Sequence, residues 1–375
     1  MSETQKHTKP NVPNLRFPGF EGEWEECLNE DFGKVITGNT PSTAETRFYE
    51  NGYRLWASPA DLGGDKYISS TQTKLTEEGF SKTRVVPQGA TLVTCIGSTI
   101  GKMGMASQEM STNQQINSVI PNESTDGQYL YYAIQSQFPR YAKSIAIQAV
   151  PIISKGAFEK LRNYRPHIEE QKRIGSFLDS IDCRITIQNK IIQRYESLIQ
   201  ALVNEIIGKN EPNALLSDVV ICTSSTMKES DLSPKGDIPL YGAAGLSGYT
   251  DHCLSERDSI LITKDGSGVG SLRYVSGRHS FVGTLNSLTP KEGIYLPYVY
   301  YALFNKNFEA YRTGQAIPHI YFKDYGKEAI YCPSYEEQKK LTRGIELIDT
   351  KIEYQKAVLQ GVQSIKAYLL ANMFI

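Results

Sequence analysis

The sequence predicts an α+β protein with two globular domains of mixed β-structure and a few helices. These domains are related by a pseudo-twofold axis and separated by two long helices packed as an antiparallel coiled coil. Two observations predict this fold. The 375-residue chain repeats one plan twice, and each repeat ends in a stretch whose apolar residues alternate three and four positions apart. At about 100 to 200 residues per domain, the length suffices for two or three cores.

Composition excludes several classes of protein. With 22% charged and 40% hydrophobic residues, the chain is typical of an ordered globular protein. No apolar run approaches the roughly 18 residues of a membrane helix, and Met1 to Lys9 is polar, so we expect a cytoplasmic protein without membrane association. The six cysteines stand singly at Cys27, Cys95, Cys183, Cys222, Cys253 and Cys332. Because no cysteine or histidine cluster has zinc spacing, we expect no metal site.

The repeat is visible as constant offsets between matching residues, which begin at 185, become 169 and end at 167. The matching pairs are Val35-Ile36 with Val220-Ile221, Tyr131-Tyr132-Ala133 with Tyr300-Tyr301-Ala302, and Glu169 to Lys172 with Glu336 to Lys339. The change of offset implies a first copy about sixteen residues longer between Gly64 and Leu92. Insertions of this kind fall in surface loops.

Each copy divides into a strand-rich part and a helical part. After an N-terminal extension over residues 1–23, we predict strand-rich domains over 24–150 and 211–315 and helical segments over 151–210 and 316–375. Apolar runs bounded by turn residues, such as Thr91 to Ile96 and Ser259 to Thr263, indicate strands. A helix is expected within each strand-rich part, around 127–137 and 296–305.

The helical segments carry the seam of the predicted coiled coil. The first seam is Ile174, Leu178, Ile181, Ile185, Gln188, Ile192, Tyr195, Ile199, Leu202 and Ile206. The second is Leu341, Ile345, Ile348, Ile352, Gln355, Leu359, Val362, Lys366, Leu369 and Met373, with Lys366 the one misfit. The alternative is a helix lying on a globular core, but such helices seldom keep a strict 3.5 period so long.

The seam also predicts a length and a register. The 33 residues from Ile174 to Ile206 would form a rod of about 50 Å. We expect Gln188 and Gln355 to meet near its middle as a polar layer that fixes register at some cost in stability. A rod with a similar domain at each end would act as a ruler.

Motifs for catalysis are missing from the sequence. There is no Gly-x-x-x-x-Gly-Lys phosphate loop and no His-Glu-x-x-His zinc helix, and the run Gly266 to Gly270 lacks dinucleotide-site spacing. None of the five histidines has the context of a catalytic base. An Asn-Pro-Pro-Tyr or Asp-Pro-Pro-Tyr loop, which an amino-methyltransferase would need, is also absent. We therefore predict a binding protein with no catalytic residue.

Polar side chains suited to reading DNA bases are dense in the strand-rich parts. Asn and Gln can read adenine, Ser and Thr contact either base type, and Lys suits guanine. The candidates in the first domain are Asn39, Thr40, Ser42, Trp56, Ser58, Lys102, Asn113, Gln114 and Gln115. Those in the second are Ser224, Ser225, Tyr241, Lys264, Ser267 and Thr284. Turn formation is the alternative for the polar residues and core packing for the matched pair Trp56 and Tyr241.

Four segments carry a resemblance to a known family: Pro13 to Phe20 with Trp24, Gly38 to Ser42, the Glu-Glu-Gln-Lys helix starts after Pro166 and Pro333, and Leu369 to Phe374. Together they resemble the specificity subunit of type I restriction-modification systems over essentially the full chain. The resemblance implies two target-recognition domains, each reading one half of a bipartite site in double-stranded DNA. It also implies helical spacers that dock modification (methyltransferase) subunits, two of them expected. The second copy departs from the pattern, with Cys222 to Ser225 where the first has Gly38 to Pro41.

The resemblance places the chemistry on partners. S-adenosylmethionine would be held by the methyltransferase subunits, ATP and Mg by a restriction subunit that translocates and cleaves DNA, and no cofactor by this chain. Two other classes are weighed against this one: a standalone methyltransferase or nuclease, and a repeat-built adaptor that binds proteins through the coiled coil instead of DNA.

Charge sharpens the DNA hypothesis. Basic and acidic residues number 10 and 13 over 24–150 and 9 and 11 over 211–315, so these domains carry net charges of minus three and minus two. The helical segments carry plus three (10 and 7) and plus one (8 and 7), and residues 1–23 are neutral, which sums to minus one overall. Because phosphate contacts need positive charge, we expect weak DNA binding by the chain alone, with partners clamping the backbone.

Overall fold

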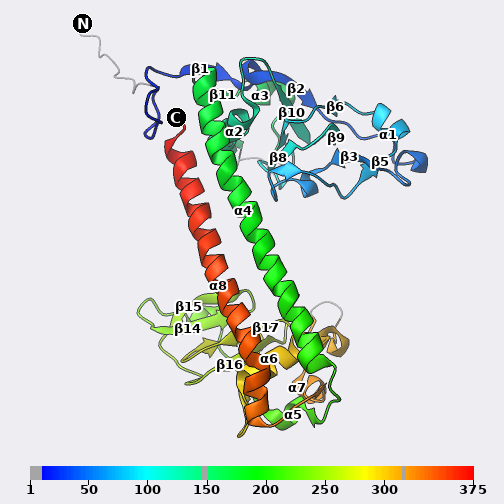
Figure 1. Ribbon diagram of the computed structural model, residues 1–375, viewed down its shortest axis with the longest axis vertical. Coiled ribbons are helices and arrows are strands. Elements are labelled where there is room, and N and C mark those ends of the chain that lie inside the picture. Colours follow the sequence, from blue (N-terminus) through cyan, green and yellow to red (C-terminus); the bar gives the residue numbers. More distant parts are fainter. Residues whose placement is uncertain (1–10, 146–150, 315–317) are drawn as a thin grey trace. The chain divides into compact units, whose positions relative to one another are not determined.

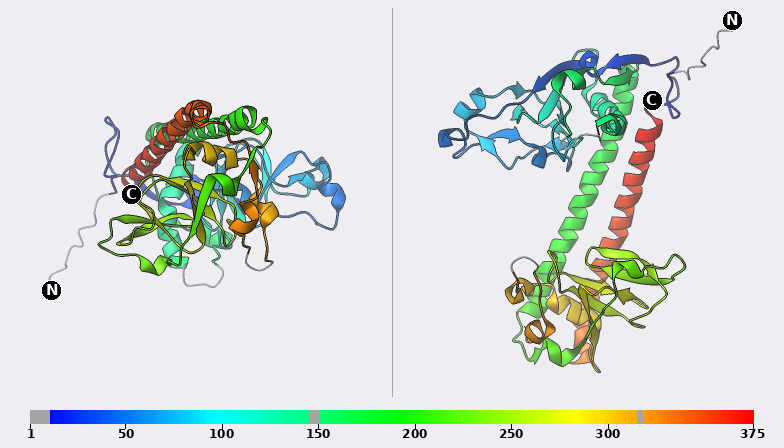
Figure 2. Two further views of the ribbon diagram at one scale, coloured as in Figure 1. Left: turned by 90° about the horizontal axis from the view of Figure 1, so that it is seen from below. Right: turned by 180° about the vertical axis from the view of Figure 1, so that it is seen from behind.

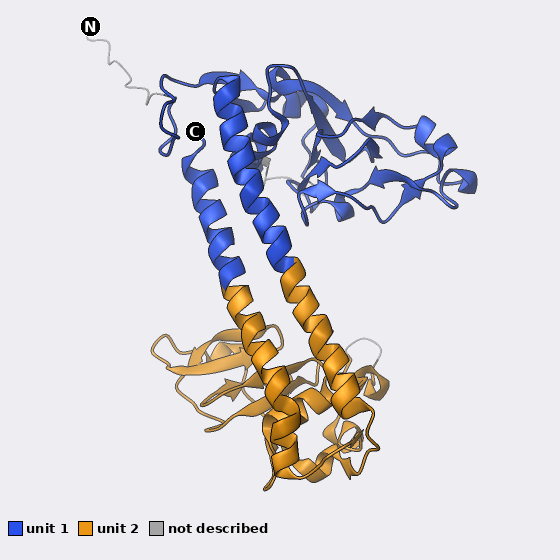
Figure 3. Ribbon diagram, in the orientation of Figure 1, with its two compact units in different colours: residues 1–189, 358–375 blue, residues 190–357 orange. Residues whose placement is uncertain are grey.

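The computed structural model describes residues 11–145, 151–314 and 318–375 (Figure 1). The first ten residues of the predicted N-terminal extension lie outside these ranges. The chain forms two compact units, which Figure 3 colours separately. Unit 1 comprises Met1–Asn189 and Val358–Ile375, and unit 2 comprises Lys190–Ala357. Each unit therefore combines one strand-rich domain with part of each long helix.

Unit 1 builds its domain from two main sheets. Its elements are β1 (Glu25–Leu28), β2 (Gly33–Thr37), β3 (Arg54–Ala57), β4 (Tyr67–Ile68), β5 (Lys74–Leu75), α1 (Glu77–Ser81), β6 (Val85–Val86), β7 (Thr91–Thr94), β8 (Met103–Ala106), β9 (Met110–Thr112), β10 (Ile116–Pro121), α2 (Gly127–Ile145), α3 (Lys155–Glu159) and β11 (Arg162–Arg165). One sheet has the order β2-β10-β7-β8-β4 and the other β5-β3-β9-β6, while β1 pairs with β11.

Unit 2 repeats this plan with fewer strands. Its elements are β12 (Ala214–Leu215), α5 (Leu216–Val219), β13 (Val220–Ser224), β14 (Ile238–Gly242), β15 (Gly245–Thr250), β16 (Ser259–Thr263), β17 (Leu272–Val275), β18 (Ser280–Phe281), β19 (Leu285–Pro290), α6 (Leu296–Leu303), α7 (Phe322–Tyr325) and β20 (Ala329–Ile330). The sheet orders are β13-β19-β16-β17, β15-β14-β18 and β12-β20. Among the described residues of unit 2, the four-stranded sheet therefore has no counterpart of β4.

Unit 1 and unit 2 each contain equivalent internal hydrogen bonds, made by residues that match at the offsets seen in the sequence. The Tyr132 hydroxyl donates to Asp182 Oδ2 at 2.6 Å, and the Tyr301 hydroxyl donates to Asp349 Oδ2 at 2.8 Å. Tyr129 and Tyr298 both donate to a backbone carbonyl, of Tyr164 and Tyr331 respectively, at 2.8 Å. The matched Gln171 and Gln338 side chains each donate to the carbonyl of the proline five residues earlier. The repeat thus conserves the joint between each domain and its helix.

The two long helices are α4 (Ile168–Val203), which ends in a π-helical turn over Asn204–Gly208, and α8 (Tyr335–Asn372). Both begin just after a proline, which disfavours helix in the residue before it, and both carry two glutamates in the first turn, where the helix dipole favours negative charge. Residues 155–165 form α3 and β11 ahead of α4, so the helix starts later than the start of the segment predicted as helical. Among the described residues, no helix is long and apolar enough to cross a membrane.

Within each unit the helix segments run antiparallel. In unit 1 the end of α8 lies beside the start of α4 in both views of Figure 2. There, Leu369 and Met373 share a core with Ile174 and Leu178. In unit 2 the Lys351 ammonium lies 6.0 Å from the ring centroid of Tyr195.

The predicted seam residues of α4 and α8 differ in how deeply they are buried, but none is exposed. Those below 10% exposure are Ile174, Leu178, Gln188, Ile192, Ile199, Ile345, Ile352, Val362, Leu369 and Met373. The others, Ile181, Ile185, Tyr195, Leu202, Ile206, Leu341, Ile348, Gln355, Leu359 and Lys366, are half-buried. The misfit Lys366 forms an ion pair across the two helices, because its Nζ lies 2.6 Å from Asp182 Oδ1.

Two distant parts of the chain meet in the core of unit 1. The Leu15 amide donates to the Asn372 carbonyl at 2.8 Å. The Phe374 ring lies 5.5 Å from the Tyr129 ring and 6.3 Å from the Trp24 ring, between centroids. Aromatic groups of this kind supply large buried apolar area. Residues 369–374 are therefore an integral part of this core.

Candidate nucleic-acid interface

One end of the five-stranded sheet of unit 1 gathers three loops. The end of β2 pairs with the start of β10, where Thr37 faces Asn117, and the start of β10 pairs with the end of β7, where Ile116 faces Thr94. β7 then turns into β8. The antiparallel register thus brings the loops 38–42, 113–115 and 95–102 to the same edge. Most candidate DNA-reading residues of the first domain lie in them.

Four candidates of this edge are exposed: Thr40, Ser42, Lys102 and Gln114. The Thr40 hydroxyl donates to Gln114 Oε1 at 2.5 Å and joins two of the loops. The Gln114 amide nitrogen is the group of this pair that suits an acceptor on a base edge. These four side chains form the accessible polar surface of the edge.

The other candidates of the first domain are engaged within the protein. Asn39 donates to the Lys82 carbonyl at 2.9 Å and accepts the Arg84 amide at 2.8 Å. Ser58 begins a short 3-10 helix and its hydroxyl donates to Asp61. Asn113 and Gln115 bond to each other at 3.1 Å. In these contacts the amides and the hydroxyl hold loop shape.

Trp56 packs in the core, which was the alternative to base contact that the sequence left open. Its side chain is 8% exposed and packs with Leu75 and Phe80, while its indole nitrogen donates to the Asn39 carbonyl at 3.0 Å. One edge of the ring still lines an open cavity of about 400 Å³ together with Thr40 and Tyr49. The indole therefore positions the loop that carries Thr40.

Unit 2 repeats the same edge. Here β13 ends beside the start of β19, which pairs with the end of β16. Ser224, Ser267 and Thr284 are exposed, and Ser225 and Lys264 are half-buried. The Ser224 hydroxyl donates to Asn286 Oδ1 at 2.8 Å, as Thr37 donates to Asn117 at 2.6 Å. Asn117 and Asn286 are buried and tie neighbouring strands together, so this hydrogen bond between strands recurs in both units.

Tyr241 is half-buried on β14 and packs against a cluster that includes Val282 and Leu285. The guanidinium of Arg273 lies 6.0 Å from its ring centroid, and the imidazole of His279 lies 6.2 Å away. His279 is fully buried, and burial lowers its pKa, so the neutral ring bonds the Ser259 hydroxyl at 2.7 Å. The structure therefore places Tyr241 in a packed cluster, next to the segment that leads to Thr284.

Two positively charged residues at the first edge were missed by sequence reasoning. Lys82 and Arg84 are exposed, and the Arg84 guanidinium donates to the Thr37 carbonyl at 2.9 Å. They lie more than forty residues along the chain from Asn39, whose hydrogen bonds, with that of Arg84 to Thr37, hold this segment at the edge. No local sequence signal pairs these segments.

A further missed residue lies at the edge of unit 2. The backbone of His319 bridges to Asp265 and to Thr313, which brings its ring to the loop after β16. The ring lies 5.1 Å from that of Tyr321. Within the described ranges, no group of three or more His, Cys, Asp or Glu side chains is arranged to hold a metal ion.

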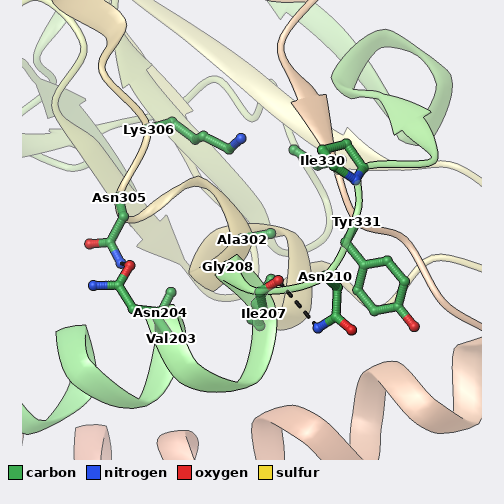
Figure 4. Close-up of a pocket in the computed structure, with 11 residues that line it drawn as sticks. Val203, Asn204, Ile207, Gly208, Asn210, Ala302, Asn305, Lys306, Ile330 and Tyr331 are labelled. Atoms are coloured by element: carbon green, nitrogen blue, oxygen red, sulfur yellow. Dashed lines mark hydrogen bonds between the residues drawn. The ribbon is translucent and has the colours of Figure 1, made fainter.

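Another cavity of unit 2, of about 230 Å³, lies where α4 ends (Figure 4). The Asn305 side chain donates to Asn204 Oδ1 at 2.8 Å, and Asn210 donates to the Ile207 carbonyl at 3.4 Å. Lys306 pairs with Glu328 at 3.0 Å. No candidate DNA-reading residue lines this cavity, and its Asn204, Asn305, Asn210 and Lys306 side chains all have partners within the protein.

Comparison with known proteins gives consistent matches. A family model described as the type I restriction modification DNA specificity domain matches residues 21–197 and 215–364. A putative type I specificity subunit of Mycoplasma genitalium is 25% identical over 315 residues, which is 76% of this chain and 80% of that protein. The crystal structure of a type I restriction-modification S subunit from M. genitalium matches with a TM-score of 0.66 at 18% identity. That match covers 97% of this chain and 99% of the other, and it shows the shared fold.

Shorter matches have higher identity. The specificity subunit of a type I restriction enzyme from Escherichia coli is 32% identical over 187 residues, or 48% of this chain. A corresponding subunit from Methanocaldococcus jannaschii is 29% identical over 181 residues, or 46% of this chain. These matches span less than half of the relatives' own length, 45% and 41% respectively.

Proposed function

Because the chain belongs to the family of type I restriction-modification DNA specificity subunits, we propose that it selects the DNA site on which a type I complex acts. In this proposal each strand-rich domain reads one half of a bipartite, asymmetric site. Partner subunits then modify or cleave the DNA. The observation that carries the proposal is the family match over both copies of the repeat, together with the loop edge that each copy presents.

The loop edges support base reading as the task of the domains. The exposed Thr40 and Gln114 in unit 1 and Ser224, Ser267 and Thr284 in unit 2 offer donors and acceptors without charge. The two edges differ in sequence, so the two half-sites would differ too. The net negative charge of both domains favours a division of labour in which partner subunits supply most phosphate contacts.

The long helices support the role of a spacer. With 36 and 38 residues, α4 and α8 extend about 54 and 57 Å at 1.5 Å per residue. A helix of this length held by an antiparallel seam is stiff on the scale of a DNA site. We propose that it sets the separation of the half-sites.

The same helices carry apolar residues that point to solvent. Phe177, Ile187 and Leu198 on α4 are 38, 58 and 43% exposed. Leu347, Tyr354, Ile365 and Tyr368 on α8 are 56 to 67% exposed. Large apolar side chains repeated along a helix favour a protein interface. They support docking of methyltransferase subunits, two in number, on the helices.

The proposal makes this chain non-catalytic. S-adenosylmethionine, ATP and Mg would be bound by the partner subunits, which would include the methyltransferase and a restriction subunit. This chain would hold the DNA in one register. It would confer sequence specificity through its contacts with DNA and would catalyse no reaction.

The decisive experiment is co-expression with the cognate methyltransferase subunit in a host without adenine methylation, followed by genome-wide mapping of methylated adenines. We expect one bipartite motif with a fixed spacer. Chimaeric chains with the 24–150 domain exchanged for that of another specificity subunit should change one half of the motif only. A complex that forms but methylates no defined motif, and retains no DNA in a gel shift, would favour the protein-binding adaptor instead.

A further inference from the structure

In unit 1 a buried lysine of the sheet bonds to side chains of α2 and α4. Lys66 immediately precedes β4, the edge strand beside β8, and is 6% exposed. Its ammonium donates to Asp179 Oδ1 at 2.8 Å, to the Tyr132 hydroxyl at 3.0 Å and to the Gln128 side chain. It also lies 4.3 Å from the Tyr132 ring centroid, where the ring face attracts a cation.

A second ammonium completes this arrangement. The Tyr132 hydroxyl donates to Asp182, whose other oxygen lies 2.6 Å from Nζ of Lys366. The Tyr67 hydroxyl donates to Asp179 at 2.9 Å. A buried charge is tolerated only when it is paired and hydrogen-bonded. Two carboxylates and a tyrosine of unit 1 therefore hold two cations supplied by the same chain.

Unit 2 keeps the anionic side of this arrangement. Asp349 stands at the position of Asp182 and accepts the Tyr301 hydroxyl at 2.8 Å, and Glu346 stands at the position of Asp179. Within the part of unit 2 that the structure describes, neither lysine has a counterpart in this arrangement. The position of Lys366 corresponds to Ile199, and the strand that follows Lys66 is missing, so β17 is the edge of its sheet among the described strands.

A cavity remains where the lysine would lie. It measures about 350 Å³ and is lined by Tyr274, Tyr300, Tyr301, Glu346, Asp349 and Glu353, with no basic residue in its lining. The Glu346 Oε1 atom is buried without a hydrogen-bond partner, while the Glu346 carboxylate as a whole interacts with the Tyr295 hydroxyl. Glu353 alone among these carboxylates pairs with a lysine, Lys356, at 3.1 Å. An unbonded buried oxygen has a free-energy cost that an incoming donor would remove.

We propose that this cavity and the free edge of β17 form a docking site for an extended segment of a second protein, whose lysine ammonium enters the cavity as Lys66 does in unit 1. The segment adds a strand to the sheet beside Leu272–Val275, parallel to β17 as β4 is parallel to β8. Charge complementarity selects the lysine: the carboxylates of Glu346 and Asp349 bind the ammonium, and the ring of Tyr301 covers it.

The identity of the second protein rests on the proposed function. A methyltransferase subunit docked on the helices reaches unit 2 along α8, which carries Glu346 and Asp349. A second copy of this chain, or a free polyamine, is an alternative occupant that the experiment separates from it.

The first arm of the test uses the chain's own segment as the probe. A fluorescent peptide with the sequence of residues 62–70, which contains Lys66 and β4, is titrated against the full chain. We expect saturable binding that weakens at least tenfold for Glu346→Gln/Asp349→Asn and for a peptide with norleucine in place of the lysine. Glu346→Gln alone leaves the bond between Tyr301 and Asp349 intact and guards against a folding defect. Glu292→Gln, an exposed carboxylate in a turn, should bind as the wild type does.

The second arm uses the complex. A carbodiimide, which joins only carboxylates and amines in contact, should link Glu346 or Asp349 to a lysine of the methyltransferase subunit, and the peptide should compete with this link. Failure of the peptide to bind, equal binding by the double variant, or a link only to a second copy would overturn the inference. A chain that binds the peptide but forms no complex with the subunit would overturn the proposed function and the assigned partner, and leave the lysine site standing.

Discussion

Replacing Lys66 with methionine tests whether its ammonium anchors the first domain to α4. Methionine has a similar length and keeps the apolar contacts with the tyrosines, so the substitution removes mainly the charge and its donors. The variant loses the ion pair to Asp179 at 2.8 Å and the bonds to Tyr132 and Gln128. The expected result is a large fall in the stability of unit 1.

The magnitude follows from burial. Removing one partner of a buried ion pair costs about 3 to 5 kcal/mol because the other charge is left uncompensated. The Lys66 side chain is 4% exposed, but Asp179 is 23% exposed and keeps the Tyr67 hydroxyl. We therefore expect the lower end, about 3 kcal/mol, or a fall in Tm of about 6 to 12 °C for a unit of this size.

Thermal and urea unfolding of the full chain, followed by tryptophan fluorescence, measure the effect because both tryptophans, Trp24 and Trp56, lie in unit 1. Lys34→Met, at an exposed lysine on β2, is the matched control and should change stability by less than about 0.5 kcal/mol. Lys66→Met/Asp179→Leu should recover part of the loss, since the uncompensated charge is gone. A loss below 1 kcal/mol for Lys66→Met would refute the reasoning.

Three further predictions concern the helices and the loop edge. Replacing Gln188 and Gln355 together with leucine should raise Tm by about 2 to 4 °C, because a polar residue in a coiled-coil seam fixes register at a cost in stability; a fall in a melting curve would contradict it. Removing seven residues from each long helix, which keeps the seam in register, shortens the spacer by about 10 Å. Methylation mapping should then show a motif shorter by about three base pairs with unchanged half-sites, and an unchanged spacer would disprove the ruler. Gln114→Ala should weaken binding by about 1 to 3 kcal/mol and relax one half-site only; equal relaxation of both half-sites in a binding-site selection would exclude direct reading by unit 1.

The repeat and the helices were predictable because they are written in periodic patterns. The apolar residues from Ile174 onward recur every 3.5 positions, and this spacing alone predicts a coiled coil. The partner of the misfit Lys366 was not predictable, since Asp182 is more than 180 residues away and only folding brings it to 2.6 Å. The sixteen-residue difference between the copies was visible in the sequence, but the expectation of a surface loop there was incomplete. That stretch of unit 1 contains β4, an edge strand with the buried residues Lys66 and Ile68, and only its pairing with β8 reveals it.

The candidate interface was predictable at the level of loops and less so at the level of atoms. The sequence identified the loops after β2 and before β10, because turn-forming polar residues follow strands. It could not separate Thr40 and Gln114, which are exposed, from Asn39, whose amide bonds to the segment around Arg84. Asparagine uses the same amide donor and acceptor to stabilise a loop and to bind a base, so the residue type alone does not distinguish these two roles.

The discontinuity of unit 1 has a consequence for biosynthesis. Residues 358–375 complete a core that otherwise consists of residues before 190, and Phe374 packs on Trp24 and Tyr129. During synthesis on the ribosome, unit 2 can therefore fold before unit 1 is complete. Unit 1 exposes apolar surface until the last turns of α8 have emerged. Truncated products that stop before residue 358 should be chaperone substrates and targets of proteolysis, so the cell would accumulate only chains in which both units are finished.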